Sequence, residues 1–305
     1  MVLKNWDEVV TLAQRAEKIQ RVVLVAAQDE PFLRAVRDAA RDGMVRPVLV
    51  GDQDRIEPLC RKLDFKVDPG DVYHEPDLHL VSGLGISLVL EGVGDFLMKG
   101  AINPSLMLTA VTSRHYGLDL GRTLSSLTWL SIPRYHKMLT ITDTFINAHP
   151  SLERKREIVV NAVKTLKVLG YIQPMVAVLA ALERVDPRLP ETADAAALKA
   201  MNRSEAIDDC LVEGPITIDL TFSKEKAAQK QFHSPVVGEA DILLASDLTL
   251  AVCLSQALGE IGGAEAGSVI VGARVPLIMS AKNTSDREKY LSLALAAAVA
   301  AGYRG

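Results

Sequence analysis

Short runs of apolar, often β-branched residues alternate with longer segments of helical periodicity along the whole chain. The runs that predict strands lie at 21–27, 46–52, 95–100, 127–132, 138–143, 174–180, 214–219, 241–246, 268–272 and 275–280. Several of them are apolar without interruption, as strands buried on both faces of a parallel sheet tend to be. The alternation therefore predicts an α/β fold with mostly parallel strands and right-handed crossovers.

Three helices can be anticipated between and after these strands. Segment 153–169 places its apolar residues on one face, and Gly170 follows where a helix should end. Thr192 predicts the N-cap of the alanine-rich helix 193–201. The tail 291–301 is the most apolar stretch. A helix of that length covers only about half of a bilayer's hydrocarbon core, which predicts a buried helix and no membrane span.

Composition narrows the class of protein. The 305 residues are 49% hydrophobic and 24% charged, which is typical of a soluble globular chain long enough for two domains. The formal net charge is −4 and aromatic residues make up 5%. A nucleic-acid-binding protein normally has a basic face or many aromatic stacking platforms, so nucleic acid is not an expected partner.

The cysteines and the first residues indicate a compartment. Cys60, Cys210 and Cys253 lie far apart without a CxxC motif, which fits a reducing cytoplasm better than a disulfide framework. The start MVLKNWDEVV lacks the apolar core of a secretory signal. Cys253 lies in an apolar segment and is expected in the core, whereas two aspartates beside Cys210 should raise its pKa. We expect a cytoplasmic protein in which neither Cys210 nor Cys253 is a nucleophile.

Most familiar catalytic motifs are missing from the sequence. It contains no GxxxxGK[ST] phosphate loop, no HExxH and no GxSxG. Gly83 and Gly85 begin a dinucleotide-like GxG, but Leu88 stands where the third glycine belongs, and no clear strand precedes it. The sequence therefore disfavours nicotinamide binding.

One polar segment, 73–79, gathers four possible metal ligands. These are His74, Glu75, Asp77 and His79, interrupted by Pro76. Polar loops broken by proline are usually solvated surface connections, and we favour that interpretation over a metal site.

The segment after strand 275–280 combines a lysine with a helix start. Ser285 and Glu288 have the spacing of a capping box, which predicts a helix N-terminus there. Free backbone N–H groups, the positive end of the helix dipole and the Lys282 ammonium could together bind an anion. Spacing alone leaves ordinary capping and loop residues as an equal alternative.

Lys99 and Gly100 follow a second buried strand at its carboxyl end. Ligands of open α/β sheets bind at this edge. A lysine that extends into solvent from a strand end is the more common arrangement, so both possibilities stay open.

Several blocks together resemble the phosphate acetyltransferase/phosphate butyryltransferase family, with the butyryl branch the more similar. The blocks are GMVRPVLVGD (43–52), GDFLMKGAIN (94–103), RYHKMLTITDTFIN (134–147), 174–198, 212–223, SPVVGEADILLASDL (234–248) and VIVGARVPLIMSAKN (269–283). Their order extends over nearly the whole chain. The resemblance implies two α/β domains with a cleft between them, in the isocitrate/isopropylmalate-dehydrogenase-like architecture. Residues 1–127 and 268–305 would form the first domain, and 128–267 the inserted second domain.

The resemblance also implies a reaction, acyl-CoA plus phosphate in equilibrium with acyl phosphate plus CoA. Butyryl or another short or branched acyl group is expected, with coenzyme A and phosphate as substrates and neither metal nor redox cofactor. A homodimer or larger assembly is implied. Two alternatives stay open, namely a catalytically impaired relative that binds CoA or phosphate, and a metal-dependent hydroxyacid dehydrogenase of the same architecture.

By the same resemblance, individual positions acquire expected roles. Ser280 and Lys282 are the catalytic candidates, and phosphate would be bound by Lys282, Asn283, Thr284 and Ser285. The substrate and CoA cleft would include Lys99, Gly100, Asn103, His136, Lys137, Asp143, Asn147 and Asp247. Such a site must offset the charge of phosphate, favour a thiolate and supply a donor to the acyl oxyanion.

Three positions depart from the family pattern. Ala281-Lys282 replaces the usual Ser-Arg, so a point charge stands where a bidentate guanidinium is common. Glu288 stands where the acetyl branch has a catalytic aspartate, and a capping role is expected for it. Ala251-Val252 replaces a Gly-Asn pair. The fold is therefore a firmer expectation than catalytic competence.

Overall fold

The computed structural model describes residues 2–303. By its internal contacts the chain divides into two compact units. The terminal unit comprises 6–122 and 266–305, and the central unit comprises 1–5 and 123–265. The sequence predicted domain boundaries at 127/128 and 267/268. The chain passes between the two units at 122/123 and 265/266, within a few residues of those positions. That the two units are separate domains stays a prediction.

Six strands make up the sheet of the terminal unit. In spatial order they are β3 (Val72–His74), β2 (Val45–Gly51), β1 (Gln20–Val25), β4 (Phe96–Lys99), β11 (Leu277–Ile278) and β10 (Glu265–Val271). Neighbouring strands are parallel from β3 to β11, whereas β10 is antiparallel to β11. The core of this unit is apolar, with β1 fully buried over Val22–Val25.

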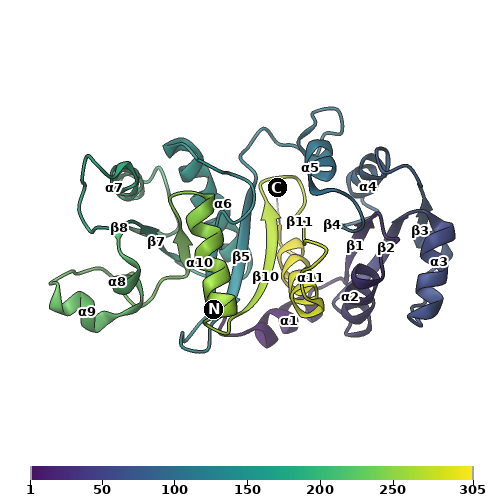
Figure 1. The fold of residues 1–305 in the computed structure, drawn as a ribbon, viewed down its shortest axis with the longest axis horizontal. Helices are drawn as coiled ribbons and strands as arrows, with labels where there is room; N and C mark the ends of the chain where they lie inside the picture. The colour runs from purple at the N-terminus through teal and green to yellow at the C-terminus, as the bar shows by residue number, and fades with distance from the viewer. Residues whose placement is uncertain (1, 304–305) are drawn as a thin grey trace. The chain divides into compact units, whose positions relative to one another are not determined.

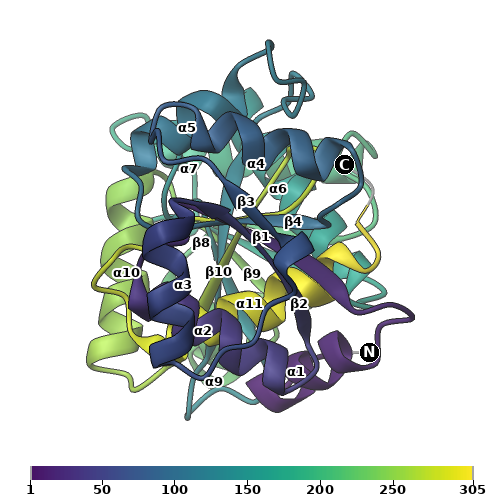
Figure 2. The same cartoon turned by 90° about the vertical axis from the view of Figure 1, so that its right-hand side faces the viewer.

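Helices cover both faces of this sheet. Figure 2 shows α4 and α5 on one face and α1, α2 and α11 on the other. Their bounds, with those of α3 and a 3₁₀ turn, are α1 (Trp6–Gln14), α2 (Glu30–Arg41), α3 (Gln53–Lys62), η1 (Pro69–Asp71), α4 (Val81–Leu90), α5 (Pro104–Thr112) and α11 (Asp286–Ala300). The chain runs outward from β1 through β2 to β3 and then returns through α4 to β4, on the other side of β1. The strand order therefore reverses between β1 and β4, where open α/β sheets place their ligands.

The central unit has the same layered construction. Its strands lie in the order β5 (Ser125–Ser131), β6 (Leu139–Thr142), β9 (Ile242–Leu244), β7 (Met175–Leu179) and β8 (Leu211–Ile216). Only β5 and β6, among these described strands, pair antiparallel. In Figure 1, α6 and α7 lie on one face and α10 on the other. The helices are α6 (Leu152–Val168), α7 (Pro190–Arg203), α8 (Ile218–Phe222), α9 (Lys224–Gln229) and α10 (Leu248–Glu260).

The predicted α/β class with mostly parallel strands is confirmed, and each predicted strand overlaps an observed one. Two of the predicted strands are longer than the observed ones. Of 275–280 only Leu277 and Ile278 form strand β11, and the last two residues of 214–219 belong to helix α8. The buried tail helix is confirmed as α11. No helix within residues 2–303 is long and apolar enough to cross a membrane.

Some local predictions were wrong. Helix α7 begins at Pro190, which suits the first helical position, and Thr192 Oγ1 instead accepts a hydrogen bond from Asp186 N at 2.9 Å. Cys253 was expected in the core but is exposed on α10. The expectation for Cys210 is confirmed, since the pKa of this buried thiol is raised to about 12, first by burial and then by Asp208 and Asp209.

Two doubtful motifs have structural roles. Gly83 and Gly85 lie inside α4, where a Cβ on Gly85 would be 2.5 Å from Val25. Gly85 lets the helix approach the sheet, Gly83 makes room for the Tyr116 ring, and the two do not form a dinucleotide loop. Segment 73–79 begins in the edge strand β3 and continues as a surface connection, where the His74 ring accepts a hydrogen bond from Gln53 N. No group of three metal-ligating side chains occurs in the part of the chain that the structure describes.

Candidate active site

The turn between β11 and α11 has the helix start that the sequence predicted. Ser285 is the N-cap, and its hydroxyl accepts a hydrogen bond from Glu288 N at 3.1 Å. Lys282 extends from this turn with 84% of its side chain exposed, and its Nζ lies 3.8 Å from Asp29 Oδ2. A flexible ammonium is therefore available beside the N-terminus of a long helix.

Lys289 supports the same turn from within the core. Its side chain is 1% exposed, and Nζ donates to the carbonyl oxygen of Thr284. The ammonium also lies 5.3 Å from the centroid of the Phe32 ring, within the range of a cation–π contact. Lys289 was not predicted from the sequence, because a lysine in the first turns of a helix usually points to solvent.

Lys99 is buried instead of extending into solvent, so the alternative of an exposed strand-end lysine was wrong. It is 3% exposed, and Nζ donates to the carbonyl oxygens of Gly100 at 3.1 Å and Ile102 at 3.4 Å. The same ammonium lies 5.0 Å from the Phe32 ring centroid. Burial lowers the pKa of Lys99, and the nearby charge of Asp29 partly opposes that shift. Lys99 thus holds the turn after β4 in place.

Gly100 and Asn103 shape that turn. Gly100 N donates to Val25 O at 2.7 Å, and a Cβ atom on Gly100 would lie 2.4 Å from Ala26 O. A glycine is needed here because two backbones meet without room for a side chain. Asn103 is the N-cap of α5, accepting a hydrogen bond from Ser105 N at 2.9 Å.

The structure brings the turns after β1, β4 and β11 together at one edge of the terminal unit. Lys282 and Lys99 come from the predicted site, whereas Asp29 and Phe32 at the start of α2 were not predicted. Neither Asp29 nor Phe32 belongs to a motif that marks a site in the sequence. Their place beside the two lysines follows from strand register, which local patterns do not reveal.

In the central unit, Asp143 and Asn147 form a compact network after β6. Asp143 is 4% exposed, and Oδ1 accepts hydrogen bonds from Phe145 N at 2.9 Å and Ile146 N at 3.0 Å. Asn147 Nδ2 donates to Asp143 Oδ2 and to Leu124 O. The network fixes the loop that leads into α6.

His136 and Lys137 are adjacent in sequence but differ in burial. His136 is exposed, and its Nε2 lies 3.0 Å from Glu239 Oε2. Lys137 is buried, and Nζ donates to Asp241 Oδ1 and Glu239 O, each at 2.7 Å. The contacts of Lys137 lie inside the central unit.

Asp247 occupies the N-cap of α10. Oδ1 accepts a hydrogen bond from Leu250 N at 3.0 Å, and Oδ2 accepts one from Ser246 Oγ at 2.9 Å. The bond from Leu250 N lowers the pKa of Asp247. Both carboxylate oxygens therefore have local hydrogen-bond donors.

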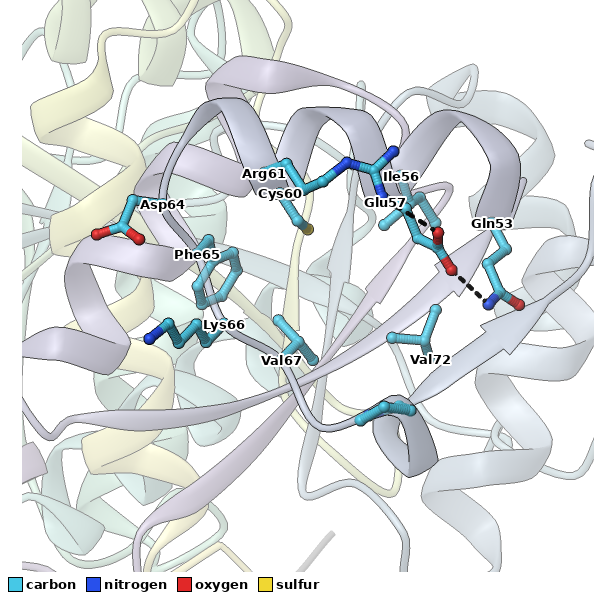
Figure 3. Close-up of a pocket in the computed structure, with 11 residues that line it drawn as sticks. Gln53, Ile56, Glu57, Cys60, Arg61, Asp64, Phe65, Lys66, Val67 and Val72 are labelled. Carbon is cyan, nitrogen blue, oxygen red and sulfur yellow. Dashed lines mark hydrogen bonds and ion pairs between the residues drawn. The ribbon is translucent and has the colours of Figure 1, made fainter.

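Each unit has at least one cavity on its described surface. One of about 270 Å³ in the central unit includes Asn147, His149 and Arg154 in its wall. The other, of about 460 Å³ in the terminal unit, lies between α3 and β3, and Figure 3 shows the side chains of Ile56, Cys60 and Val72 around it. Burial raises the pKa of the Cys60 thiol. The second cavity contains no residue that the sequence analysis selected.

The comparisons with known proteins agree with one another. The family model described as "Phosphate acetyl/butaryl transferase" matches residues 75–297. The chain is 32% identical to the phosphate butyryltransferase of Clostridium acetobutylicum over 98% of its own length and 99% of that protein's. It is 33% identical to the phosphate acetyltransferase of Thermotoga maritima, covering 93% of this chain and 96% of that protein.

A solved structure shows the same fold. The branched-chain phosphotransacylase from Enterococcus faecalis V583 superposes with a TM-score of 0.81 at 26% identity. The match covers 93% of this chain and 100% of that one. Sequence and fold therefore point to the same group of proteins.

Proposed function

The chain belongs to the phosphate acetyl/butaryl transferase family, and on that premise we propose that it transfers an acyl group reversibly between coenzyme A and inorganic phosphate. The reaction is RCO–S–CoA + HPO₄²⁻ ⇌ RCO–OPO₃²⁻ + CoA–SH. A carbon–oxygen bond forms, a carbon–sulfur bond breaks, and the phosphate proton ends on sulfur. The same membership supports the transferase over the hydroxyacid dehydrogenase that the sequence left open.

The observation that supports this proposal best is the position of Lys282. An exposed ammonium at the capped start of α11 can bind a phosphate oxygen while the first turn of the helix favours negative charge. Asn283, Thr284 and Ser285 form the rest of the proposed phosphate turn. The Ser280 hydroxyl would donate a hydrogen bond to the negatively charged oxygen that develops on the acyl group.

Other residues of the terminal unit would position this turn. Lys99 and Lys289 hold the turns after β4 and β11 beside Phe32, and Gly100 permits the close approach of the turns after β4 and β1. Asn103 would act through its cap on α5. We propose that these groups keep Lys282 and its neighbours in register and do not react themselves.

In the central unit we propose His136 and Asn147 as contacts of coenzyme A. His136 is exposed, so its ring can reach a ligand. Asn147 lines a cavity with Arg154 and His149, and this cavity could receive the phosphate groups of coenzyme A. Lys137, Asp143 and Asp247, also expected in the substrate cleft, would support the fold around these contacts through their buried or capping hydrogen bonds.

The reaction transfers no electrons, and lysine can offset the phosphate charge, so we propose that no metal or redox cofactor takes part. We propose a preference for four-carbon or branched acyl groups, following the resemblance at Lys99-Gly100 and His136-Lys137. The free cysteines Cys60, Cys210 and Cys253 fit a cytoplasmic enzyme. A homodimer or larger assembly is also proposed and can be checked by light scattering.

One assay tests the reaction. Coenzyme A is mixed with acetyl, propionyl, butyryl or isobutyryl phosphate in excess chelator, and thioester absorbance is followed. We expect thioester formation, with kcat/KM highest for a four-carbon or branched donor. A clear acetyl preference contradicts the proposed chain length. Loss of activity that one metal restores contradicts the metal-free reaction, and CoA binding without turnover indicates an impaired relative.

A further inference from the structure

The turn that follows β1 has an unusual and well-supported backbone. Ala26 has φ 57°, in the left-handed region that non-glycine residues rarely adopt. Hydrogen bonds hold the turn from both neighbouring strands, from Ala27 N to Val50 O at 2.9 Å and from Ala101 N to Ala26 O at 2.7 Å. The turn therefore directs Asp29 to a defined position at the edge where β1 and β4 end.

The carboxylate of Asp29 does not cap the helix that it precedes. Asp29 is the N-cap residue of α2, yet its side chain makes no capping hydrogen bond. Its side chain is 11% exposed, and Oδ1 is buried without any hydrogen-bond partner among residues 2–303. A buried acceptor left unpaired is unfavourable, so a donor supplied by a ligand would be stabilising there.

The charges around Asp29 favour a particular kind of ligand. Lys282 Nζ lies 3.8 Å from Oδ2, and the charge of Asp29 also acts on buried Lys99. An anion bound by Lys282 would lie next to the Asp29 carboxylate. Two negative groups tolerate such closeness when a proton is shared between them. The anion must then carry a hydroxyl, which hydrogenphosphate has and sulfate lacks near neutral pH.

We propose that Asp29 recognises the proton of hydrogenphosphate, with Oδ1 accepting a hydrogen bond from the P–OH group while Lys282 binds an unprotonated oxygen. This inference rests on the proposed function, which places phosphate beside Lys282. Asp29 then selects phosphate over sulfate, an anion of the same charge and similar shape. This role explains why Oδ1 has no partner in the described part of the protein and why the Asp29 side chain does not cap α2.

In the reaction, the proton that Asp29 recognises must move from phosphate to the sulfur of coenzyme A. Hydrogenphosphate has one proton, the acyl phosphate dianion has none, and CoA–SH gains one. As the acyl C–O bond forms and the C–S bond breaks, Asp29 takes the proton from phosphate and passes it to the departing sulfur.

The first test uses the unmodified protein and needs no turnover. Calorimetry measures binding of phosphate, arsenate, sulfate and molybdate to the full-length chain. Hydrogenarsenate carries a hydroxyl and should bind with an affinity close to that of phosphate. Sulfate and molybdate should bind at least tenfold more weakly, since a hydrogen bond to a charged group accounts for about a tenfold to hundredfold change. Equal binding of sulfate and phosphate would overturn the proposal.

The second test changes the acceptor. Asp29→Asn places an amide donor where the proton acceptor stood, so phosphate affinity should fall and sulfate affinity should rise. Asp52→Asn is the matched control, because Asp52 is likewise the N-cap residue of a helix in the same unit, α3, and its side chain also makes no capping hydrogen bond. Its phosphate-to-sulfate ratio should equal that of the wild type. An unchanged ratio in folded Asp29→Asn overturns the proposal and leaves Asp29 as only an ion-pair partner.

These tests separate two failures. If no acyl phosphate yields a thioester but phosphate still binds in preference to sulfate, the proposed reaction fails while the role of Asp29 stands. If thioester forms and the anion preference is absent or independent of Asp29, the reaction stands and the role of Asp29 is refuted.

Discussion

A Cβ atom on Gly100 would lie 2.4 Å from the carbonyl oxygen of Ala26, so the turns after β4 and β1 meet backbone against backbone. Gly100 N also donates to Val25 O at 2.7 Å. The place of Asp29 at the start of α2 therefore depends on a glycine in the turn of the neighbouring strand.

Gly100→Ala tests this relationship. The added methyl group must displace one of the two turns, which we expect to lower the free energy of unfolding by about 1–3 kcal/mol. The kcat/KM for phosphate should fall too, because Asp29 and Lys99 flank the displaced backbone. Urea denaturation and steady-state kinetics measure the two effects.

Gly259→Ala is the control for that substitution. Gly259 lies in α10, and the nearest atom to an added Cβ is 4.0 Å away. Alanine in a helix is favoured over glycine by about 1 kcal/mol, so this variant should be slightly more stable than the wild type. If Gly100→Ala matched the wild type in both stability and kcat/KM, the close backbone approach would have no functional importance.

Asp247→Ala distinguishes a helix cap from a substrate contact. Loss of the cap should lower the free energy of unfolding by about 1 kcal/mol at neutral pH, and Asp247→Asn should lose much less. A capping role leaves kcat/KM unchanged. A raised KM for coenzyme A with unchanged stability would instead support the substrate-cleft role that the family resemblance implies.

The same variant has a defined pH dependence. The folded state lowers the pKa of Asp247 below its ordinary value of 3.8, chiefly through the bond from Leu250 N. The stabilisation from the ionised carboxylate is therefore fully present above pH 3.8 and is lost as the pH falls through the lowered folded-state pKa. The stability difference between wild type and Asp247→Ala should be constant above that value and shrink below it.

Lys137 and Asp241 form a buried ion pair whose rupture should be costly. Lys137→Met alone leaves Asp241 buried without its cation, for which we expect a loss of about 3–5 kcal/mol. The double variant Lys137→Met/Asp241→Asn removes both charges and keeps an acceptor for Met175 N. It should be more stable than Lys137→Met, and additive losses in urea denaturation would contradict a coupled pair.

Apolar runs and capping signals were sufficient to predict most of the fold. Strand positions and the helix start at Ser285 depend on local sequence, and both were predicted. Strand β3 was missed because Val72–His74 has only three residues, too few to form a recognisable apolar run. The exposure of Cys253 was missed because burial of a helix face depends on what packs against it, which hydrophobicity alone does not specify.

The site was predicted only in part for a similar physical reason. Lys282 and Lys99 were selected from strand ends, but their environments depend on residues distant in sequence. Lys99 is buried because Phe32 from α2 and two turn carbonyls surround its ammonium. Asp29 was not selected from the sequence, and its relation to Lys282 exists because β1, β4 and β11 end at one edge of the sheet.

Kinetics of Lys282→Ala and Lys282→Arg test the central claim, that phosphate is bound at the turn between β11 and α11. Removing the ammonium should lower kcat/KM for phosphate by about thirtyfold to a thousandfold, because a charge-assisted contact to the reacting phosphate is lost. Lys282→Arg should retain activity, and both variants should melt like the wild type since 84% of the side chain is exposed. A wild-type rate with unchanged phosphate KM in Lys282→Ala would contradict the claim and place the phosphate site elsewhere.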